Sequence, residues 1–493
     1  MLTVLILPIA AFVFALLSIM AMVMVAAISS RWPGRLFSYL MWLILIASVG
    51  TILFSERVLR MDYYGLVVDS EGDTGSHMLS KLLLAAVIGC SVALCAAWIF
   101  TFKKNKTGNN RFYQRGLQAP TDIVTSFMVF YVAFSILPIF FGQRYAFHIS
   151  LVYPFFVFLA LFLWVQRSNI DPAVILKQCL SVLVVGSLIA GVAAPQLAVQ
   201  PGYIGLIPGF SSRLWGITSH ANGLGSVACL LFILEAAEPT KRAWLSRCIL
   251  LAAAAAMILA QSKTSIVAAF IGFSIIFVWR FLLQAQAKSE DGRHKENLVI
   301  ISALGSLMAF TAIFGAWVIF SETSILDALA RRLEGRALDD LSTGAGRTLI
   351  WSVAIQGGME NPLFGQGSEF WSLENRLRWG LSGAVHAHNL FLQVFSRSGF
   401  VGLATLLLFL YFLSQYAVRA SGVTRGASIA ILTVFFMRAM SEVPISPNSI
   451  LGSEFFAMMA CFIYLIDRGG RPVPKLRKRG VMRRPINNLI TDN

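Results

Sequence analysis

The sequence is poor in charge. Only 13% of its 493 residues are charged, whereas soluble domains average about 25%. Hydrophobic residues make up 57%, and the mean hydropathy is +0.73. Apolar runs of about 20 residues recur from end to end, and each is long enough to cross a hydrocarbon core as a helix. The scarcity of charge therefore excludes a soluble globular protein and predicts an all-α, polytopic integral membrane protein.

Carboxylates are nearly absent from the middle of the apolar runs. Those nearest to membrane depth are Glu235, Glu442 and Glu454, and each lies close to the end of a run. Ion-coupled transporters place ionisable groups inside their spans, so this distribution argues against that class. A glycan flippase or exporter would need a continuous polar path through the spans, and no row of polar residues runs inside them.

Cysteines and metal-binding motifs are scarce as well. All six cysteines lie in or at the edge of apolar runs, which argues against a disulfide framework or a zinc site and favours small buried hydrophobes. The polar loops contain no DxD motif, only the adjacent pair Asp339 and Asp340. No nucleotide-binding glycine loop is present. We therefore expect no metal, no other cofactor and no nucleic-acid partner.

Hydropathy predicts about thirteen spans. Four basic segments, 103–116, 241–247, 287–297 and 468–484, then fall on one side, which the positive-inside rule assigns to the cytoplasm. The first run lacks a basic n-region and a clear cleavage site, so we expect a retained helix. The predicted spans are 2–30, 36–55, 80–102, 123–141, 146–165, 178–198, 221–236, 248–262, 265–284, 298–320, 389–415, 427–441 and 453–466.

The opposite side receives three substantial segments, 56–80, 200–223 and 321–388. The third is too long for a simple connection, and its tryptophans argue against disorder. Within it, residues 346–358 predict a short amphipathic helix that ends at Gly357 and Gly358. This outer side gathers basic residues: Arg213, Lys263, Arg331, Arg332, Arg336, Arg347, Arg376, Arg378 and Arg397, with His220, His386 and His388.

These residue types outline one chemistry. An arginine guanidinium binds two phosphate oxygens at once and can hold a diphosphate. A neutral imidazole can take a proton from a sugar hydroxyl near neutral pH. Together they predict glycosyl transfer from a sugar attached to a lipid diphosphate.

Three segments carry a resemblance to a known family. They are RLWGITSHANGLG from Arg213, GRTLIWSVAIQGGMENPLFGQG from Gly346, and HAHNLFLQVFSRSGFVG from His386. In this order, around one long outer loop, they resemble the O-antigen ligase and polymerase superfamily of bacterial envelope enzymes (WaaL-like and Wzy-like). The likeness is best over about residues 205–415.

The resemblance implies roles for matching residues. His388 would activate the acceptor hydroxyl as general base, and Arg213 and Arg347 would grip the diphosphate. Lys263 stands where relatives often have Ser-Arg. A lysine keeps the positive charge of arginine but lacks the guanidinium that binds two oxygens at once. Arg397 joins this basic set, with His386 and Asn389 as supporting residues.

The resemblance also implies a metal-independent, inverting enzyme of the bacterial inner membrane, with its site facing the periplasm. The donor would be a glycan on undecaprenyl diphosphate, and the acceptor a glycan or a lipid A-core sugar. A flippase and a chain-length regulator are the implied partners. We favour a polymerase of exopolysaccharide or O-antigen slightly over a ligase. The predicted organisation is N-terminal helices at 1–204, a core at 205–415 containing loop 321–388, C-terminal helices at 416–466 and a basic tail at 467–493.

Each site residue has a structural alternative. His388 could cap a helix, Arg213 could snorkel to the interface, and Arg347 could stack on Trp351 four residues on. Arg397 lies roughly 13 Å past His388 at about 1.5 Å per residue, and needs either a polar cavity or a partner on another helix.

Three further alternatives remain open. The cluster Arg331, Arg332 and Arg336 alternates with acidic residues and is typical of a salt-bridged surface. A flippase, or a non-catalytic assembly protein that tolerates loss of His388, would be the function from another class.

Overall fold

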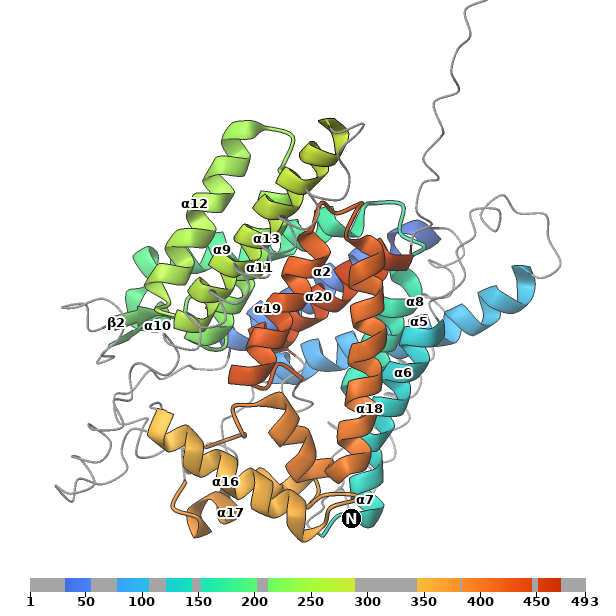
Figure 1. Ribbon diagram of the computed structural model, residues 1–493, viewed down its shortest axis with the longest axis vertical. Helices are drawn as coiled ribbons and strands as arrows, with labels where there is room; N and C mark the ends of the chain where they lie inside the picture. Colours follow the sequence, from blue (N-terminus) through green and yellow to red (C-terminus); the bar gives the residue numbers. More distant parts are fainter. Residues whose placement is uncertain are drawn as a thin grey trace, which may run out of the picture.

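The computed structural model describes residues 32–54, 78–105, 121–143, 152–201, 212–288, 344–381, 384–445 and 451–470. In these residues the regular structure is helical apart from one two-stranded ribbon, so the all-α prediction is confirmed. Most helices form one bundle. A smaller layer, built from α16 (Gly344–Glu360), η5 (Ser368–Trp371) and α17 (Leu373–Arg378), lies at one end of it (Figure 1) and is called the end layer below.

The helices of the N-terminal half have long apolar sequences interrupted by few polar residues. Their packing includes one specific polar tie, in which the Trp164 indole N–H donates to the Leu94 carbonyl oxygen at 3.0 Å. The elements are η1 (Pro33–Arg35), α2 (Leu36–Phe54), α5 (Met78–Asn105), α6 (Thr121–Tyr131), the π-helical turn η3 (Val132–Ile136), α7 (Leu137–Phe141), α8 (Tyr153–Val165), α9 (Pro172–Ala193) and α10 (Pro195–Ala198).

The second half of the chain adds the ribbon and the remaining helices of the bundle. In the antiparallel ribbon, Gln200 lies opposite Arg213. The elements are β1 (Val199–Pro201), β2 (Ser212–Leu214), α11 (Ala221–Ala237), α12 (Ala243–Leu259), α13 (Lys263–Lys288), α18 (Leu390–Ala420), α19 (Ala427–Ser441) and α20 (Ser453–Gly470).

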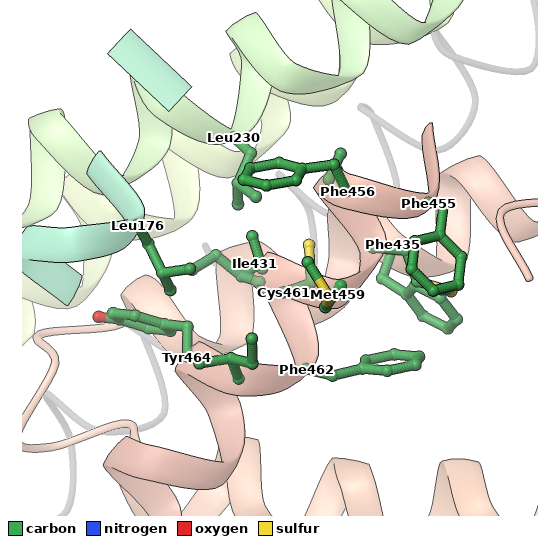
Figure 2. Close-up of a cluster of buried hydrophobic side chains, with 14 of the residues drawn as sticks. Leu176, Leu230, Ile431, Phe435, Phe455, Phe456, Met459, Cys461, Phe462 and Tyr464 are labelled. Atoms are coloured by element: carbon green, nitrogen blue, oxygen red, sulfur yellow. The ribbon is translucent and has the colours of Figure 1, made fainter. Parts of the chain in front are cut away.

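Helix α20 forms the centre of the bundle. Its aromatic and aliphatic side chains meet Leu176 of α9, Leu230 of α11 and Phe435 of α19 (Figure 2). The same helix carries a buried charge, Arg468, whose guanidinium lies 3.0 Å from an Asp171 oxygen. Such a buried charge is tolerated because it is paired.

The helices agree with a multi-pass membrane protein. Among the described residues, six helices are long and apolar enough to cross a membrane, and four shorter apolar helices of 10–17 residues accompany them. Predicted spans 2–30 and 298–320 lie outside the described residues, so the count of thirteen stays a prediction. Segment 56–77, the arginine cluster at 331–336 and residues 471–493 of the basic tail lie outside them as well.

One predicted boundary is wrong. Hydropathy starts the span near residue 178, whereas α9 begins at Pro172, capped by the Asp171 side chain. The charge of Lys177 lowers the local hydropathy and delays the predicted start. In the fold this charge is neutralised, because Lys177 Nζ lies 3.0 Å from a buried carboxylate oxygen of Glu235.

The end layer has a core of its own. Ile350 and Ala354 of α16 are buried with Phe370, Trp371 and other residues of this layer. The predicted helix is therefore confirmed, although its apolar residues are not confined to one face, and it does not end at its two glycines: α16 runs on to Glu360. A Cβ on Gly357 would lie 2.2 Å from the Phe370 ring, so the glycine serves close packing and not helix termination.

Helix α18 is broken at Gly399, where the backbone has φ 61° and ψ −158°. Two helical hydrogen bonds are replaced there by bonds to the turn that follows α16. Phe400 N donates to Pro362 O at 2.7 Å, and Val401 N donates to Leu363 O at 3.1 Å. On the other side of the break, the carbonyl oxygens of Ser396 and Arg397 accept from Gln366 N and Gly367 N at 2.9 and 3.0 Å.

These four bonds, called the clip below, satisfy backbone groups that a break inside a membrane helix would otherwise leave unpaired. They also explain the glycines of the NPLFGQG turn. Gly365 has φ 69°, and a Cβ there would lie 2.3 Å from the Ser398 backbone nitrogen. The clip joins the end layer to the lower end of the long rod of α18 in Figure 1.

Candidate active site

The turn before α18 holds His386, Ala387, His388 and Asn389 in a fixed shape. Asn389 caps the helix, since its side-chain oxygen accepts from Phe391 N and Leu392 N at 3.0 and 3.1 Å. The helix cap predicted as an alternative role for His388 therefore belongs to the next residue. His388 itself has φ 48°, a region that a residue with a side chain rarely adopts.

Three hydrogen bonds hold this unfavourable turn. His388 N donates to His386 Nδ1 at 3.1 Å, and Ala387 N donates to Gln393 Oε1 at 2.9 Å. From the end layer, the Trp351 indole N–H donates to Ala387 O at 3.1 Å. The turn is thus shaped by α18 and α16 together.

A carboxylate contacts the His388 ring. Glu442 follows α19, and its Oε2 is 3.2 Å from His388 Nδ1. Its Oε1 accepts from Asn222 Nδ2 at 3.1 Å. Only 6% of the Glu442 side chain is exposed, against 25% of His388. Burial raises the pKa of Glu442, but the hydrogen bond from His388 and the positive charges nearby, Arg438 included, hold it well below its usual range.

The two histidines of the turn have different environments. The ring centroids of His386 and His388 are 4.2 Å apart. His386 Nδ1 already accepts a backbone N–H, so in its neutral form its proton must be on Nε2. Burial, then the neighbouring His388, lowers the pKa of His386 to about 3. His386 is therefore neutral near pH 7 and can act as a hydrogen-bond donor.

Arg213 is brought to the same region by the ribbon. Its Nε donates to Gln200 Oε1 at 2.6 Å, and its Nη2 lies 3.5 Å from His220 Nε2. Arg213 is 6% exposed, so it does not snorkel to water. His220 caps α11 through Nδ1, which accepts from Asn222 N at 3.1 Å. The Asn222 side chain donates to Glu442.

Arg347 approaches from the end layer. It lies in the first turn of α16, four residues before Trp351, and its charge acts on His386. Within the described residues no ring contact joins Arg347 to Trp351, whose indole is engaged with Ala387. The stacking alternative is not what the structure shows.

Lys263 begins α13, two residues after Gln261. The Gln261 amide donates to Ser212 O of β2 at 2.7 Å, next to Arg213 along the strand. The segment that carries Lys263 is therefore joined to the ribbon that carries Arg213.

Arg397 is placed apart from this group. Its guanidinium lies 4.9 Å from the centroid of the Phe134 ring in η3, and the charge of Glu369 acts on it. It is 4% exposed. Arg397 lies nine positions after His388 in the sequence. Its contact with Phe134 of η3 corresponds to the second predicted alternative, a partner on another helix.

One group of donor atoms in the described residues could hold a metal ion. Ligand atoms of His386, His388 and Glu442 lie within 4.8 Å of one another. Two imidazoles and a carboxylate suit a transition metal. The same atoms are already hydrogen-bonded, because the backbone N–H of His388 donates to His386 Nδ1 and His388 Nδ1 contacts Glu442 Oε2.

Glu442 is the site residue that sequence reasoning missed. It was weighed only as an acid near membrane depth and rejected as a transport site. Its signal was the position itself, since a carboxylate directly after an apolar helix on the outer side needs a partner.

Comparison with known proteins gives one family match, over part of the chain. Residues 248–407 match the family model described as O-antigen ligase. The matched range runs from α12 into α18 and contains Lys263, Arg347 and His388, whereas Arg213 and Glu442 lie outside it. No curated protein matches the chain. The match supports the O-antigen ligase and polymerase superfamily of membrane enzymes, and the apolar helical bundle agrees with a multi-pass membrane protein.

Proposed function

We propose that this enzyme transfers a glycan from undecaprenyl diphosphate to an acceptor sugar hydroxyl at the periplasmic face of the inner membrane. One observation carries the proposal: three segments far apart in the chain meet at the His386–His388 turn. Arg213, on the β1–β2 ribbon, lies 3.5 Å from His220, whose charge acts on His386. Arg347 lies on α16, and the two histidines directly precede α18. Phosphate-binding and proton-accepting groups are thereby brought together.

His388 is the proposed general base. Its Nδ1 faces a carboxylate, which leaves Nε2 as the nitrogen that can accept a proton. His386 is unsuited to this role, because its Nδ1 accepts a backbone N–H and its Nε2 carries the hydrogen. The geometry therefore supports His388 over His386 as the general base. In the sequence, only the family resemblance favoured His388.

Arg213 and Arg347 are the proposed diphosphate ligands, with Lys263 as a further positive charge. They offset the charge that develops on the leaving diphosphate, the work that a metal ion does in other sites. The reaction would thus need no metal, and direct attack by the acceptor would invert the anomeric centre. The end layer would cover the site and exclude water, which would otherwise hydrolyse the donor.

Polymerase and ligase share this chemistry and differ in the acceptor. We place first the polymerisation of an exopolysaccharide or O-antigen, in which a second lipid-linked glycan is the acceptor. The second candidate is transfer to a lipid A-core sugar, and the family description, O-antigen ligase, favours it. A flippase that delivers the donor and a chain-length regulator would be partners of the polymerase.

The test is glycan assembly in cells that lack this protein and are re-supplied with His388→Ala. We expect normal membrane levels, accumulated lipid-linked donor and no product. A single lipid-linked repeat unit would indicate a polymerase, and long lipid-linked chains a ligase. His294→Ala, a histidine in the predicted cytoplasmic segment 287–297, is the matched control. Normal product from His388→Ala would refute catalysis and restore the export or assembly alternatives.

A further inference from the structure

Glu442 has the placement of a residue that acts through His388. It is buried, and both of its oxygens are engaged, one by His388 Nδ1 and one by Asn222 Nδ2. These partners belong to the starts of two different helices, α18 and α11. Glu442 itself is fixed by its backbone, since its N–H donates to Arg438 O at 2.7 Å.

The carboxylate determines which nitrogen of His388 carries the hydrogen. A carboxylate only accepts hydrogen bonds, so Nδ1 must be the donor in the 3.2 Å contact. Neutral His388 then keeps its lone pair on Nε2. A carboxylate in this position also stabilises the imidazolium that forms when Nε2 takes a proton.

We propose that Glu442 is a positioning residue that makes His388 the base of the glycosyl transfer. This inference rests on the function proposed above. In the transfer step, the acceptor hydroxyl gives its proton to His388 Nε2, and its oxygen forms a bond to the anomeric carbon. The bond from that carbon to the phosphate oxygen breaks, and its electron pair leaves with undecaprenyl diphosphate. Glu442 balances the positive charge on His388 until the proton passes to water.

A purely structural role would predict different behaviour. If Glu442 only tied α11 to α18, its neutral isostere would retain most of the tie, and any loss of product would follow loss of folded protein. A positioning role depends on the negative charge. Glutamine removes this charge at nearly constant shape, so Glu442→Gln separates the two roles.

The pH dependence of the reaction rate distinguishes the two roles, because a purely structural contact between α11 and α18 would not change it. Among the described residues, the charge of His388 interacts with Glu442 after α19, Glu454 on α20 and His386 on its own turn. The same network includes His220 at the start of α11, Arg347 on α16 and Arg438 on α19. Of these, Glu442 forms the ion pair. Without the charge of Glu442, a proton taken up at Nε2 has no counter-ion 3.2 Å from Nδ1. The acidic limb of the rate profile should therefore move to lower pH in Glu442→Gln.

The experiment uses the full chain in isolated membranes of the producing cell, whose own lipid-linked glycan is the donor. Product formation is followed against pH for the wild type, Glu442→Gln, Glu442→Asp and His388→Ala. We expect Glu442→Gln to be folded, about 10–100-fold slower and shifted in its acidic limb. Glu442→Asp, which keeps the charge, should recover part of the rate.

Matched variants keep the test decisive. Glu235→Gln removes another buried carboxylate, the partner of Lys177, and should leave the acidic limb in place. If Glu442→Gln does not fold, Asn222→Ala serves instead, because it releases Oε1 and leaves the His388 contact. Asn222→Ala should lower the rate less than Glu442→Gln does, and it should leave the acidic limb of the pH profile in place.

Two results would overturn the inference. In the first, His388→Ala is inactive but Glu442→Gln has the wild-type rate and the wild-type pH profile. This result would leave the proposed function intact. The other is wild-type activity that is lost in a chelator and restored by Zn²⁺, since Glu442 would then be a metal ligand with His386 and His388. An active His388→Ala would instead refute the proposed function itself.

Discussion

Replacing Gly399 with alanine should open the clip between α18 and the end layer. Holding alanine at φ 61° and ψ −158° costs about 1–3 kcal/mol. Its Cβ would lie 2.4 Å from Pro362 O, so the bonds from Phe400 N and Val401 N would also be lost, at about 1 kcal/mol each. The total is about 3–5 kcal/mol. Because about 1.4 kcal/mol is a factor of ten, the open population should rise at least 100-fold.

Hydrogen exchange in the purified full chain measures this opening directly. The amides of Phe400, Val401, Gln366 and Gly367 donate the four bonds of the clip, and their exchange should accelerate in Gly399→Ala. Opening should also displace α16, which carries Arg347, so glycan assembly in cells should fall to less than about a tenth. The rest of the bundle should keep its protection.

Two other glycines separate backbone strain from steric overlap. Gly380 has φ 67° but no atom within 4 Å of an added Cβ, whereas Gly89 has neither a positive φ nor a close neighbour. We expect Gly380→Ala to cost about 1–2 kcal/mol and Gly89→Ala to be nearly neutral. Wild-type exchange at Phe400 and Val401 in Gly399→Ala would refute the clip as the element that holds the end layer.

Three further predictions concern the site. Trp351→Phe removes the N–H that binds Ala387 O, so it should lower the stability of the end layer by about 1 kcal/mol and reduce glycan assembly, as measured by exchange and product analysis. Arg213→Lys keeps the charge but loses the fork and the Nε contact to Gln200, so cells should accumulate lipid-linked donor at normal protein levels. The pKa of His386 is lowered from 6.5 to about 3, so as pH falls through this window the unfolded chain binds a proton that the folded chain does not. Thermal stability should therefore fall with pH in that window, and His386→Asn should remove this part of the slope; an unchanged slope would contradict the burial of this ring.

Much of the bundle could be predicted because membrane helices must satisfy every backbone group internally and cover themselves with apolar side chains. The predicted span 427–441 coincides with α19, and 221–236 is one residue short of α11. Hydropathy fails where a charge is neutralised by a distant partner. Lys177 delays the predicted start of α9, and only the fold shows that Glu235, on another helix, pairs with it.

Glycines were harder to interpret than apolar runs. A glycine pair after an amphipathic stretch is a common helix end, yet Gly357 and Gly358 lie inside α16 because aromatic rings press against them. The GxG of the NPLFGQG turn predicts tight backbone geometry, but not its partner. That partner is the break at Gly399, more than thirty residues away, and local propensity carries no information about it.

The candidate site shows the same division. Motifs around Arg213, Arg347 and His388 could be found because each has a local pattern of polar and apolar residues. Glu442 has no such pattern, and its position directly after an apolar helix indicates only that it needs a partner, not which residue that partner is. Its two partners, His388 and Asn222, lie 54 and 220 residues away from it along the chain. The predicted core 205–415 should accordingly be extended through residue 445.

The position of His388 explains why the end layer must be held so firmly. Ala387 packs in the small core of the end layer, whereas Leu390 packs in the core of the bundle. His388 and Asn389 therefore form the junction of two hydrophobic cores, with Glu442 on the bundle side and Arg347 on the end-layer side. Two cores joined by a short turn would shift relative to each other, and a shift of about 1 Å can cost a site like this 100-fold in rate. The clip at Gly399 and the Trp351 bond tie the two cores on either side of the turn. They keep the proposed base, His388, in register with Arg347, the proposed phosphate ligand, although the two residues lie on different sides of this junction.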